Sequence, residues 1–301
     1  MCGIMGYYCF GKKTPDKDKI TEMFRKLENR GRDASGFAFI NEKNNLVVYK
    51  VPVPSSELVK TNDWKELELP RVFIAHARAK TQGSEKCDAN NHPLYNKYGL
   101  CIVHNGMILN DDEIFIRGKR DGEVDSEAIL AVLASKRKGD PIKKVFDTLD
   151  GSFSFALIDK NEPDKLVLVK KDNPLELYFD VESDILYFCS TKDIMREGLG
   201  VKQVTKRGFS IGDGQYHHFT LENNHSLIIN SEGVESYKRY NPKKDYYPYQ
   251  SYGTCEYPKP AKDFDWIECP FCLGVTLYNP DKPVNKCECC GMRLAEEDLY
   301  V

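Results

Sequence analysis

The chain has 301 residues, a formal net charge of -3 at pH 7 and 41% hydrophobic residues. This length allows one large domain and a small additional module. The near-neutral charge gives no reason to expect a nucleic-acid or membrane partner, and no apolar run reaches the ~20 residues that span a bilayer. The N-terminus also lacks the basic and apolar segments of a secretory signal. We therefore expect a soluble, cytoplasmic protein.

Cysteine usage narrows the class further. Of the 11 cysteines, five lie between Cys269 and Cys290, and the others are scattered along the chain. Disulfide-stabilised secreted domains instead carry their cysteines as a framework through a small fold. A cluster beside scattered thiols is typical of a reducing compartment and one metal site.

Residues 1–236 mix short β-type runs with a few helical segments. Segments 16–30 and 125–138 are predicted helices, because their apolar residues follow a 3.6-residue period and a glycine follows each of them. The strand-like runs are 36–40, 45–51, 71–76, 100–104, 151–158, 165–170 and 184–189. Many strands around few helices predict an α+β fold, with packed sheets and helices outside them.

The composition changes after residue 236. Residues 237–265 are rich in Tyr and Pro and have no periodicity, which indicates an extended linker. A small module, residues 266–301, completes the sequence. The predicted organisation is thus a large domain over 1–236, the linker and the C-terminal module.

The sequence begins MCGIMGYY, with a reactive side chain at position 2. If Met1 is removed, Cys2 carries a thiol and a free α-amine on one residue. An α-amine titrates near ~8 and a free thiol near ~8.5, so the amine is suited to accept the thiol proton at neutral pH. Such a residue combines a nucleophile with its base. The alternative is that Cys2 is a small apolar residue at the start of a buried strand.

Polar clusters occur elsewhere in the large domain, namely RGRDASG (30–36), HARAKTQG (76–83), NNHPL (90–94), HNG (104–106) and EVDSE (123–127). Each cluster alone is explained by a turn, a strand end or a helix start. A single histidine such as His76, His92 or His104 is likewise more often structural than catalytic. Only their combination indicates chemistry.

Together these clusters suit attack of Cys2 on a carbonyl carbon. The tetrahedral intermediate needs hydrogen-bond donors aimed at its oxyanion. Asn105 and Gly106, after the strand 100–104, offer a side-chain amide and an unobstructed backbone N–H.

An amino-acid substrate also needs partners for its two charged ends. A carboxylate suits a bidentate guanidinium, and Arg78, followed by Thr81 in a loop, offers one. Asp125 is available for the ammonium group. With the nucleophile and the oxyanion donors, these residues describe a site for attack on the side-chain amide of glutamine.

Cys-Gly-Ile-x-Gly at 2–6 and the five clusters, in this order and spacing, resemble the motif series of class II glutamine amidotransferases. These are N-terminal-nucleophile hydrolases, and the resemblance is nearest to the glutaminase domain of glucosamine-6-phosphate synthases. It extends from Cys2 to about residue 230. It implies a four-layer αββα sandwich and L-glutamine as the substrate.

Carried over to this sequence, the resemblance makes Cys2 the nucleophile and its α-amine the base. Asn105 and Gly106 would form the oxyanion hole, Arg78 with Thr81 would bind the substrate carboxylate, and Asp125 would bind its α-amine. It implies a γ-glutamyl thioester intermediate and no cofactor for catalysis.

The sequence also departs from the family pattern. Ala79 and Gln82 stand where the sugar synthases have an aromatic residue and a histidine beside the R-x-x-T loop. The resemblance therefore does not imply how this loop is ordered over the substrate. Arg30 and Asp33 are expected to be structural supports near the nucleophile.

Family members that use the ammonia carry a synthase domain after the glutaminase domain. The sequence after residue 236 shows no phosphate-binding or nucleotide-binding motif. We therefore expect an ammonia-accepting synthase subunit in trans. Two alternatives stay open: a freestanding hydrolase of γ-glutamyl amides or peptides, and a non-catalytic adaptor that docks partners.

The C-terminal module carries two C-x2-C pairs, Cys269 with Cys272 and Cys287 with Cys290. Thiolates at this spacing form two knuckles around tetrahedral Zn²⁺, as in a zinc ribbon, and an iron site of the rubredoxin type is the alternative. Cys289 is expected to be a spare thiol, and competition between Cys289 and Cys290 for the metal stays open. Four thiolates leave no position for water, so we expect a structural metal. Because the module has no basic footprint, we expect it to contact protein and not nucleic acid.

Overall fold

The computed structural model divides the chain into two compact units, Met1–Asp245 and Tyr246–Val301. In the first unit it describes residues 2–116, 120–135, 139–200, 209–211 and 214–242. In the second unit it describes residues 265–268, 275–278, 285–286 and 293–294. Among all of these residues, no helix has the length and apolar character needed to cross a membrane.

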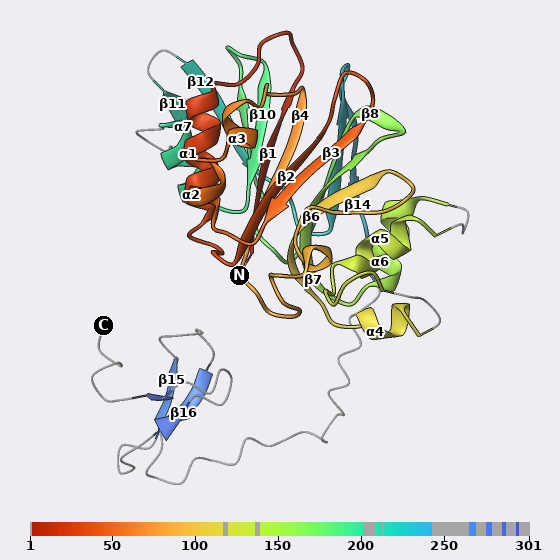
Figure 1. The fold of residues 1–301 in the computed structure, drawn as a ribbon. Helices are drawn as coiled ribbons and strands as arrows, with labels where there is room; N and C mark the ends of the chain where they lie inside the picture. The colour runs from red at the N-terminus through yellow and green to blue at the C-terminus, as the bar shows by residue number, and fades with distance from the viewer. Residues whose placement is uncertain are drawn as a thin grey trace. The chain divides into compact units, whose positions relative to one another are not determined.

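The first unit contains two antiparallel sheets, which we name sheet A and sheet B (Figure 1). Sheet A has eight strands, in the order β11 (Phe209–Ile211), β12 (Gly214–Thr220), β9 (Glu176–Asp180), β10 (Ile185–Cys189), β1 (Gly3–Cys9), β4 (Val72–Arg78), β2 (Ala34–Ile40) and β3 (Leu46–Val51). Sheet B has six, in the order β14 (Gly233–Arg239), β13 (His225–Asn230), β8 (Glu162–Lys171), β7 (Gly151–Asp159), β6 (Leu100–Ile108) and β5 (Leu94–Tyr95).

Helices cover the outer face of each sheet. On sheet A these are α1 (Lys17–Leu27), α2 (Ser55–Leu58), α3 (Asn62–Lys65) and α7 (Lys192–Leu199). On sheet B they are α5 (Glu127–Leu133) and α6 (Pro141–Thr148). The short α4 (Asp111–Ile114) lies between β6 and β7 of sheet B, and the 3₁₀ turn η1 (Asp88–Asn90) lies in the connection from β4 of sheet A to β5 of sheet B.

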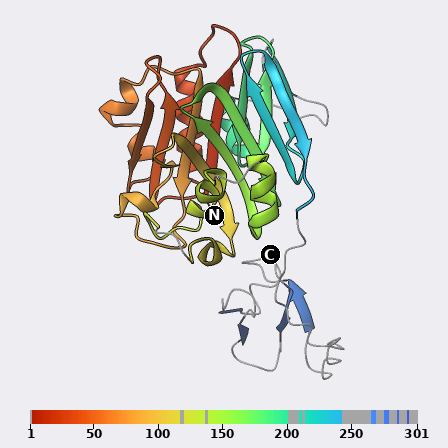
Figure 2. The same ribbon diagram turned by 90° about the vertical axis from the view of Figure 1, so that its right-hand side faces the viewer.

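The unit has four layers: helices, sheet A, sheet B and helices. A cluster of buried apolar side chains fills each of the three spaces between neighbouring layers. Alternating residues of β1 show the division, because Met5 and Tyr7 pack under the sheet A helices, whereas Ile4 and Tyr8 pack between the sheets. A third cluster fills the space between sheet B and its helices. Figure 2 shows the sheets face to face. The four-layer arrangement matches the αββα sandwich expected from the resemblance.

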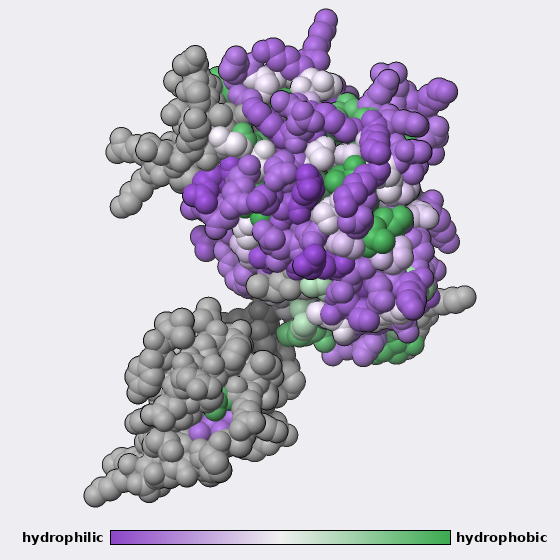
Figure 3. Space-filling view, turned by 60° about the vertical axis from the view of Figure 1, so that its left-hand side comes forward, coloured by the Kyte–Doolittle hydropathy of each residue, from purple (hydrophilic) through white to green (hydrophobic). Residues whose placement is uncertain are grey.

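Local sequence explains the helix that covers sheet A. The side chain of Asp16 caps α1 by accepting hydrogen bonds from the N–H groups of Asp18 and Lys19. The 3.6-residue spacing then buries one apolar stripe, which comprises Ile20, Met23, Phe24 and Leu27. The opposite face is polar, and the side of the unit drawn in Figure 3 is mostly hydrophilic.

All seven predicted strand runs lie within or overlap observed strands of sheets A and B. The predicted helix 16–30 corresponds to α1, and the predicted helix 125–138 corresponds to the shorter α5, which begins at Glu127 and ends at Leu133. Residues 136–138 lie outside the described residues.

The domain boundary predicted at residue 236 falls inside β14, which continues to Arg239. Tyr240 is also buried, and its ring stacks on Phe146 of α6 at 4.6 Å between ring centroids. The first unit therefore extends past the predicted boundary. Composition alone placed the boundary too early, because the tyrosines at 237 and 240 belong to the end of the sandwich and not to a linker.

The second unit contains two pairs of short antiparallel strands. β15 (Asp265–Glu268) pairs with β16 (Val275–Tyr278), and β17 (Asn285–Lys286) pairs with β18 (Arg293–Leu294). The predicted zinc ligands Cys269, Cys272, Cys287 and Cys290 lie outside the described residues.

Candidate active site

Cys2 lies directly before β1, near the centre of sheet A. Its neighbour Gly3 pairs with Ala77 on β4, which places Cys2 beside the end of β4 that carries Arg78. The Cys2 thiol donates a hydrogen bond to the carbonyl oxygen of Ala79 at 3.5 Å. Burial raises the pKa of the Cys2 thiol, although the positive charge of Arg78 opposes this shift. The resting thiol is therefore neutral, and it needs a proton acceptor before it can attack.

Arg30 joins Cys2 to sheet B. Its Nε–H donates to the carbonyl oxygen of Cys2 at 2.8 Å, and its Nη2 donates to Oδ1 of Asn105 at 3.5 Å. Asp33 supports the same region, because its Oδ2 accepts the N–H of Lys80 at 2.6 Å and its N–H donates to the carbonyl of Arg78. Both residues act as the structural supports that the sequence predicted.

Asn105 provides a buried donor without a partner. The residue is 1% exposed, and its Nδ2 has no hydrogen-bond partner among the described residues. Because Oδ1 accepts from Arg30, the orientation of this amide is fixed by a contact at its other atom. An unpaired buried donor costs about 1–3 kcal/mol, which an acceptor atom of a ligand would offset.

Gly106 leaves room beside this donor. Its φ of +145° is one that other residues rarely adopt, and a Cβ at this position would lie 2.1 Å from the carbonyl oxygen of Ser152. The sequence placed Asn105 and Gly106 after a strand, but both lie inside β6, which continues to Ile108. The HNG segment is thus part of the sheet and not a tight turn.

Arg78 is buried at the end of β4, where it binds the loop that follows. Its Nη1 donates to Oδ1 of Asn91 at 2.8 Å, and its Nη2 donates to the carbonyl oxygens of Gln82 and Gly83. A guanidinium has two edges with parallel N–H groups, one formed by Nε and Nη2 and the other by Nη1 and Nη2, so both include Nη2. A carboxylate bound in bidentate fashion must therefore replace at least one of these two carbonyl groups.

The two departures from the family pattern make their contacts through the backbone. The carbonyl oxygen of Ala79 accepts a hydrogen bond from the Cys2 thiol. The carbonyl oxygen of Gln82 accepts one from Nη2 of Arg78. A different side chain at either position retains these contacts. Thr81 lies between them on the loop with an exposed side chain.

Asp125 lies within electrostatic reach of the nucleophile, since its negative charge contributes to the raised pKa of Cys2. Its Oδ2 accepts the N–H of Ile108 at 2.6 Å, and its Oδ1 accepts the hydroxyl of Ser126 at 3.3 Å. The structure thus brings Cys2, Arg78, Asn105 and Asp125 to one end of the sandwich.

Three buried histidines underlie this site, and sequence reasoning did not recognise them as a cluster. The rings of His76 and His92 stack at 4.2 Å between centroids, and His104 contacts the hydroxyl of Ser126 through Nδ1 at 2.7 Å. Burial lowers the pKa of all three, in His76 to about 3. In the sequence, each histidine is within two residues of Arg78, Asn91 or Asn105. Closeness to these site residues was the sequence signal from which the histidine cluster could have been predicted.

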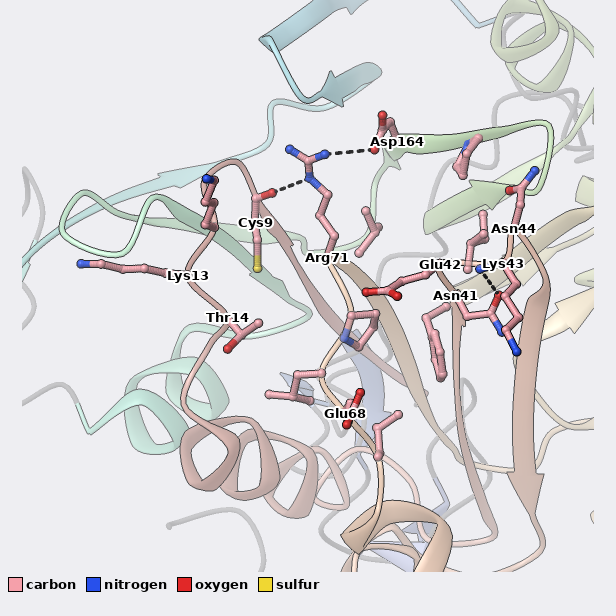
Figure 4. Close-up of a pocket in the computed structure, with 18 of the residues that line it drawn as sticks. Cys9, Lys13, Thr14, Asn41, Glu42, Lys43, Asn44, Glu68, Arg71 and Asp164 are labelled. Atoms are coloured by element: carbon pink, nitrogen blue, oxygen red, sulfur yellow. Dashed lines mark hydrogen bonds and ion pairs between the residues drawn. The ribbon is translucent and has the colours of Figure 1, made fainter.

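A large groove lies at the other end of β1 (Figure 4). It has a volume of about 1020 Å³ and is lined by Cys9, Lys13, Arg71 and Asp164 among others. Arg71 donates to the carbonyl oxygen of Cys9 at 3.0 Å and pairs with Asp164 at 3.1 Å. Among the described residues, no group of three or more His, Cys, Asp or Glu side chains is arranged to hold a metal ion.

Comparison with known proteins agrees with this geometry. Residues 76–197 match the family model described as a glutamine amidotransferase domain. The glutamine–fructose-6-phosphate aminotransferase of Buchnera aphidicola is 30% identical over 247 residues, which are 76% of this chain and 39% of that protein. The enzyme of the same name from Aquifex aeolicus is 35% identical over 184 residues, 58% of this chain and 30% of that protein. The chain thus spans well under half the length of these relatives.

Solved structures support the fold. The glutamine phosphoribosylpyrophosphate amidotransferase from B. subtilis superposes with a TM-score of 0.61 at 17% identity, over 79% of this chain and 49% of that one. Another structure, of the allosteric regulatory enzyme of purine biosynthesis, has a TM-score of 0.58 at 17% identity, with the same coverage. Residues 76–197 thus match a glutamine amidotransferase domain, and the two-sheet architecture is an N-terminal-nucleophile type of fold.

Proposed function

We propose that this protein hydrolyses the side-chain amide of L-glutamine to glutamate and ammonia, with Cys2 as the nucleophile. The observation that carries the proposal is the buried, unpartnered Nδ2 of Asn105, which Arg30 connects to the backbone of Cys2. A reactive thiol beside a preorganised amide donor is what acyl transfer requires.

The reaction begins with removal of the thiol proton. Once Met1 is removed, the α-amine of Cys2 accepts this proton, and the sulfur attacks the side-chain carbonyl carbon of glutamine. The C=O electron pair moves to oxygen, where Asn105 Nδ2 and the N–H of Gly106 donate to it. When the intermediate collapses, the C–N bond breaks, and the amide nitrogen takes the proton from the α-ammonium and leaves as ammonia.

The second half releases glutamate. Water attacks the γ-glutamyl thioester, the α-amine accepts a proton from it, and the second tetrahedral intermediate again places its oxyanion at Asn105 and Gly106. Breaking of the C–S bond returns the proton to sulfur and yields glutamate. The net reaction consumes one glutamine and one water and needs no cofactor.

We assign the charged ends of the substrate to Arg78 with Thr81 and to Asp125. Arg78 binds the carboxylate when the carbonyl groups of Gln82 or Gly83 give way, so substrate binding changes the loop 79–83. Asp125 retains lone pairs for the α-ammonium, because each of its oxygens accepts one described hydrogen bond.

We further propose that the ammonia passes to a separate acceptor protein. One observation supports this: the similar proteins are named as aminotransferases. In addition, the segment after Gly106 exposes large apolar side chains at Met107, Leu109 and Ile116, which are 47%, 53% and 76% exposed. Apolar side chains exposed beside a reaction site suit contact with another protein.

The proposal is tested by incubating the purified full chain with glutamine, asparagine and γ-glutamyl dipeptides. We expect equimolar glutamate and ammonia from glutamine and little turnover of asparagine. Faster turnover of γ-glutamyl dipeptides would instead identify a freestanding γ-glutamyl hydrolase. No turnover of any of them, with Met1 removed, would leave only the adaptor alternative.

For the second unit we propose a structural zinc ribbon held by Cys269, Cys272, Cys287 and Cys290. The described strands support this, because β15–β16 and β17–β18 pair on either side of one C-x2-C segment each. Metal analysis should find one zinc per chain, which Cys269→Ser should remove without loss of glutamine hydrolysis. Retention of stoichiometric zinc in this variant would contradict the assignment. Iron in place of zinc would indicate the rubredoxin type of site.

A further inference from the structure

Asn173 is a second buried amide without a partner at this end of the molecule. It lies in the crossover from β8 of sheet B to β9 of sheet A, is 8% exposed, and its Nδ2 has no hydrogen-bond partner among the described residues. The crossover passes over β7, where Asp172 forms a bridge with Phe153 and the carbonyl oxygen of Pro174 accepts the hydroxyl of Ser154 at 3.3 Å.

Strand register places the start of β9, which follows this crossover, at the end of sheet A where β1 starts. β9 and β1 run in the same direction on either side of β10, and Cys189 of β10 pairs with both Glu176 and Met5. On sheet B, the strand partners of Phe153 and Ser154 are Gly106 and Asn105.

Asn173 lies close to Gly106, one of the two proposed oxyanion donors. A Cβ on Gly106 would lie 2.9 Å from Nδ2 of Asn173, so this nitrogen occupies the space beside Gly106. Gly106 is therefore adjacent in sequence to one residue whose amide nitrogen has no partner among the described residues, Asn105, and close in space to another, Asn173. Two buried donors without acceptors beside one glycine indicate a place for an oxygen atom of a ligand.

We infer that Asn173 is a further catalytic residue, whose Nδ2 donates to the substrate carbonyl oxygen as it becomes an oxyanion. This inference rests on the proposed hydrolysis of glutamine. As the sulfur–carbon bond forms and the C=O pair moves to oxygen, Asn173 Nδ2 would add a donor to those of Asn105 and Gly106. A donor that acts on this developing charge raises kcat and has little effect on substrate binding.

The test replaces the donor and leaves the size of the side chain unchanged. Asn173→Asp exchanges the N–H groups for a carboxylate oxygen, and we expect kcat for glutamine to fall about 10²-fold with KM changed less than about 3-fold. Asn173→Ser is the second variant, because its hydroxyl is too short to reach the same position. Circular dichroism and thermal melting establish that each variant is folded.

Asn223 supplies the matched control. It holds the same crossover, since its Oδ1 accepts the N–H of Asp172 at 2.6 Å and its Nδ2 donates to the Asp172 carboxylate. If Asn173 acts only by holding the crossover in place, Asn223→Ala, which also loosens the crossover, should reduce kcat as much as Asn173→Ser. We expect Asn223→Ala to retain the wild-type kcat. An equal loss in the two variants, a loss confined to KM, or wild-type kcat in Asn173→Ser would overturn the inference.

A second measurement separates this inference from the proposed function. The glutamine analogue 6-diazo-5-oxo-L-norleucine carries a carbonyl group at the side-chain position; the thiol protonates its diazo carbon, N₂ leaves, and the sulfur forms a C–S bond. If wild-type protein neither hydrolyses glutamine nor forms this adduct, the proposed function fails. If wild type does both and Asn173→Asp retains the wild-type kcat for glutamine, only the role of Asn173 fails. Because no oxyanion develops when sulfur displaces N₂, we expect this variant to form the adduct at close to the wild-type rate while its kcat for glutamine falls.

Discussion

The two ends of β1 each carry a cysteine, and they differ in what surrounds it. Cys9 lies beside the groove of about 1020 Å³, whereas Cys2 lies among polar groups that lack partners. The strand separates the two residues by about 23 Å. By volume alone, the Cys9 end is the better ligand site, but the chemistry of its side chains does not support catalysis.

Hydrogen bonding explains the difference. At the Cys9 end, Arg71 donates to two backbone carbonyl groups and to Asp164, so its donors are already used by the fold. Burial raises the pKa of Cys9 to about 12, so its thiol is protonated at neutral pH. At the Cys2 end, two buried amide nitrogens have no acceptor in the part of the chain that the structure describes. Unsatisfied donors beside a thiol are thus a better guide to a reaction site than the volume of a cavity.

The largest expected effect comes from exchanging Cys2 for alanine, with Cys9→Ala as the comparison. Cys2→Ala should reduce turnover of glutamine by roughly 10⁴-fold or more, because the covalent pathway is lost. Cys9→Ala removes only a buried side chain, so it should lower the free energy of unfolding and leave kcat unchanged. Steady-state kinetics and urea unfolding of both variants measure the contrast. Loss of turnover in Cys9→Ala, with the fold intact, would place chemistry at both ends.

Removal of the first unpartnered donor should have the next largest effect. Asn105→Ala should lower kcat by roughly 10²–10³-fold and change KM little, as expected for a donor to the oxyanion. Asn45, in the turn between β2 and β3 at the other end, is the control, and Asn45→Ala should be neutral. A change in KM alone for Asn105→Ala would assign this residue to substrate binding.

Recognition of the carboxylate should show a smaller effect. Arg78→Lys retains the positive charge but loses the planar fork, so we expect kcat/KM to fall about 10–10²-fold, mainly through KM. Arg71→Lys at the Cys9 end should leave both constants unchanged. Since Arg78 also holds the loop through Gln82 and Gly83, limited proteolysis should distinguish a loosened loop from lost binding. Equal kinetics of the two variants would contradict the assignment.

The smallest expected effect concerns the free energy of unfolding. Its dependence on pH has opposite signs for His76 at the Cys2 end and for Cys9 at the other end. Burial lowers the pKa of His76 from 6.5 to about 3, so its contribution to stability is present above about pH 6.5 and is lost as the pH falls toward 3. Burial raises the pKa of Cys9 from 9.0 to about 12, so its contribution is present below pH 9 and is lost as the pH rises toward 12.

Urea unfolding at several pH values tests this contrast. His92, stacked on His76, also has a pKa lowered by burial, so His92→Leu should flatten the acid side by up to about 1.36 kcal/mol per pH unit. Cys9→Ala should flatten only the alkaline side. An unchanged acid slope in His92→Leu would show that the histidine cluster does not control acid stability.

Sequence reasoning predicted much of the fold, because its signals were local. The stripe on α1 and the apolar runs of β4, β6 and β7 depend on periodicity and burial within one segment. The end of the first unit was placed too early because Tyr240 becomes buried only through contact with Phe146, nearly a hundred residues away in sequence. Such a contact leaves no local pattern.

The site divides in the same way. Cys2, Asn105, Arg78 and Asp125 belong to motifs, so their types and order were sufficient to propose them together. Asn173 belongs to no motif, and only the crossover beside β7 and the space beside Gly106 bring it to the site. The hydrogen bonds from Arg78 to the carbonyl oxygens of Gln82 and Gly83 could not be predicted either, because every residue has a backbone carbonyl group and the sequence does not show which one accepts.

The most direct test of the account is the location of the reactive thiol. The native full chain is treated with 6-diazo-5-oxo-L-norleucine, digested and analysed by peptide mass spectrometry, with glutamine present as a competitor in a parallel sample. We predict one adduct, on Cys2 at the N-terminus of a chain from which Met1 has been removed, and glutamine should protect against it. An adduct on Cys9 or another cysteine, or full turnover by protein that retains Met1, would contradict the claim that the Cys2 end of β1 performs the chemistry.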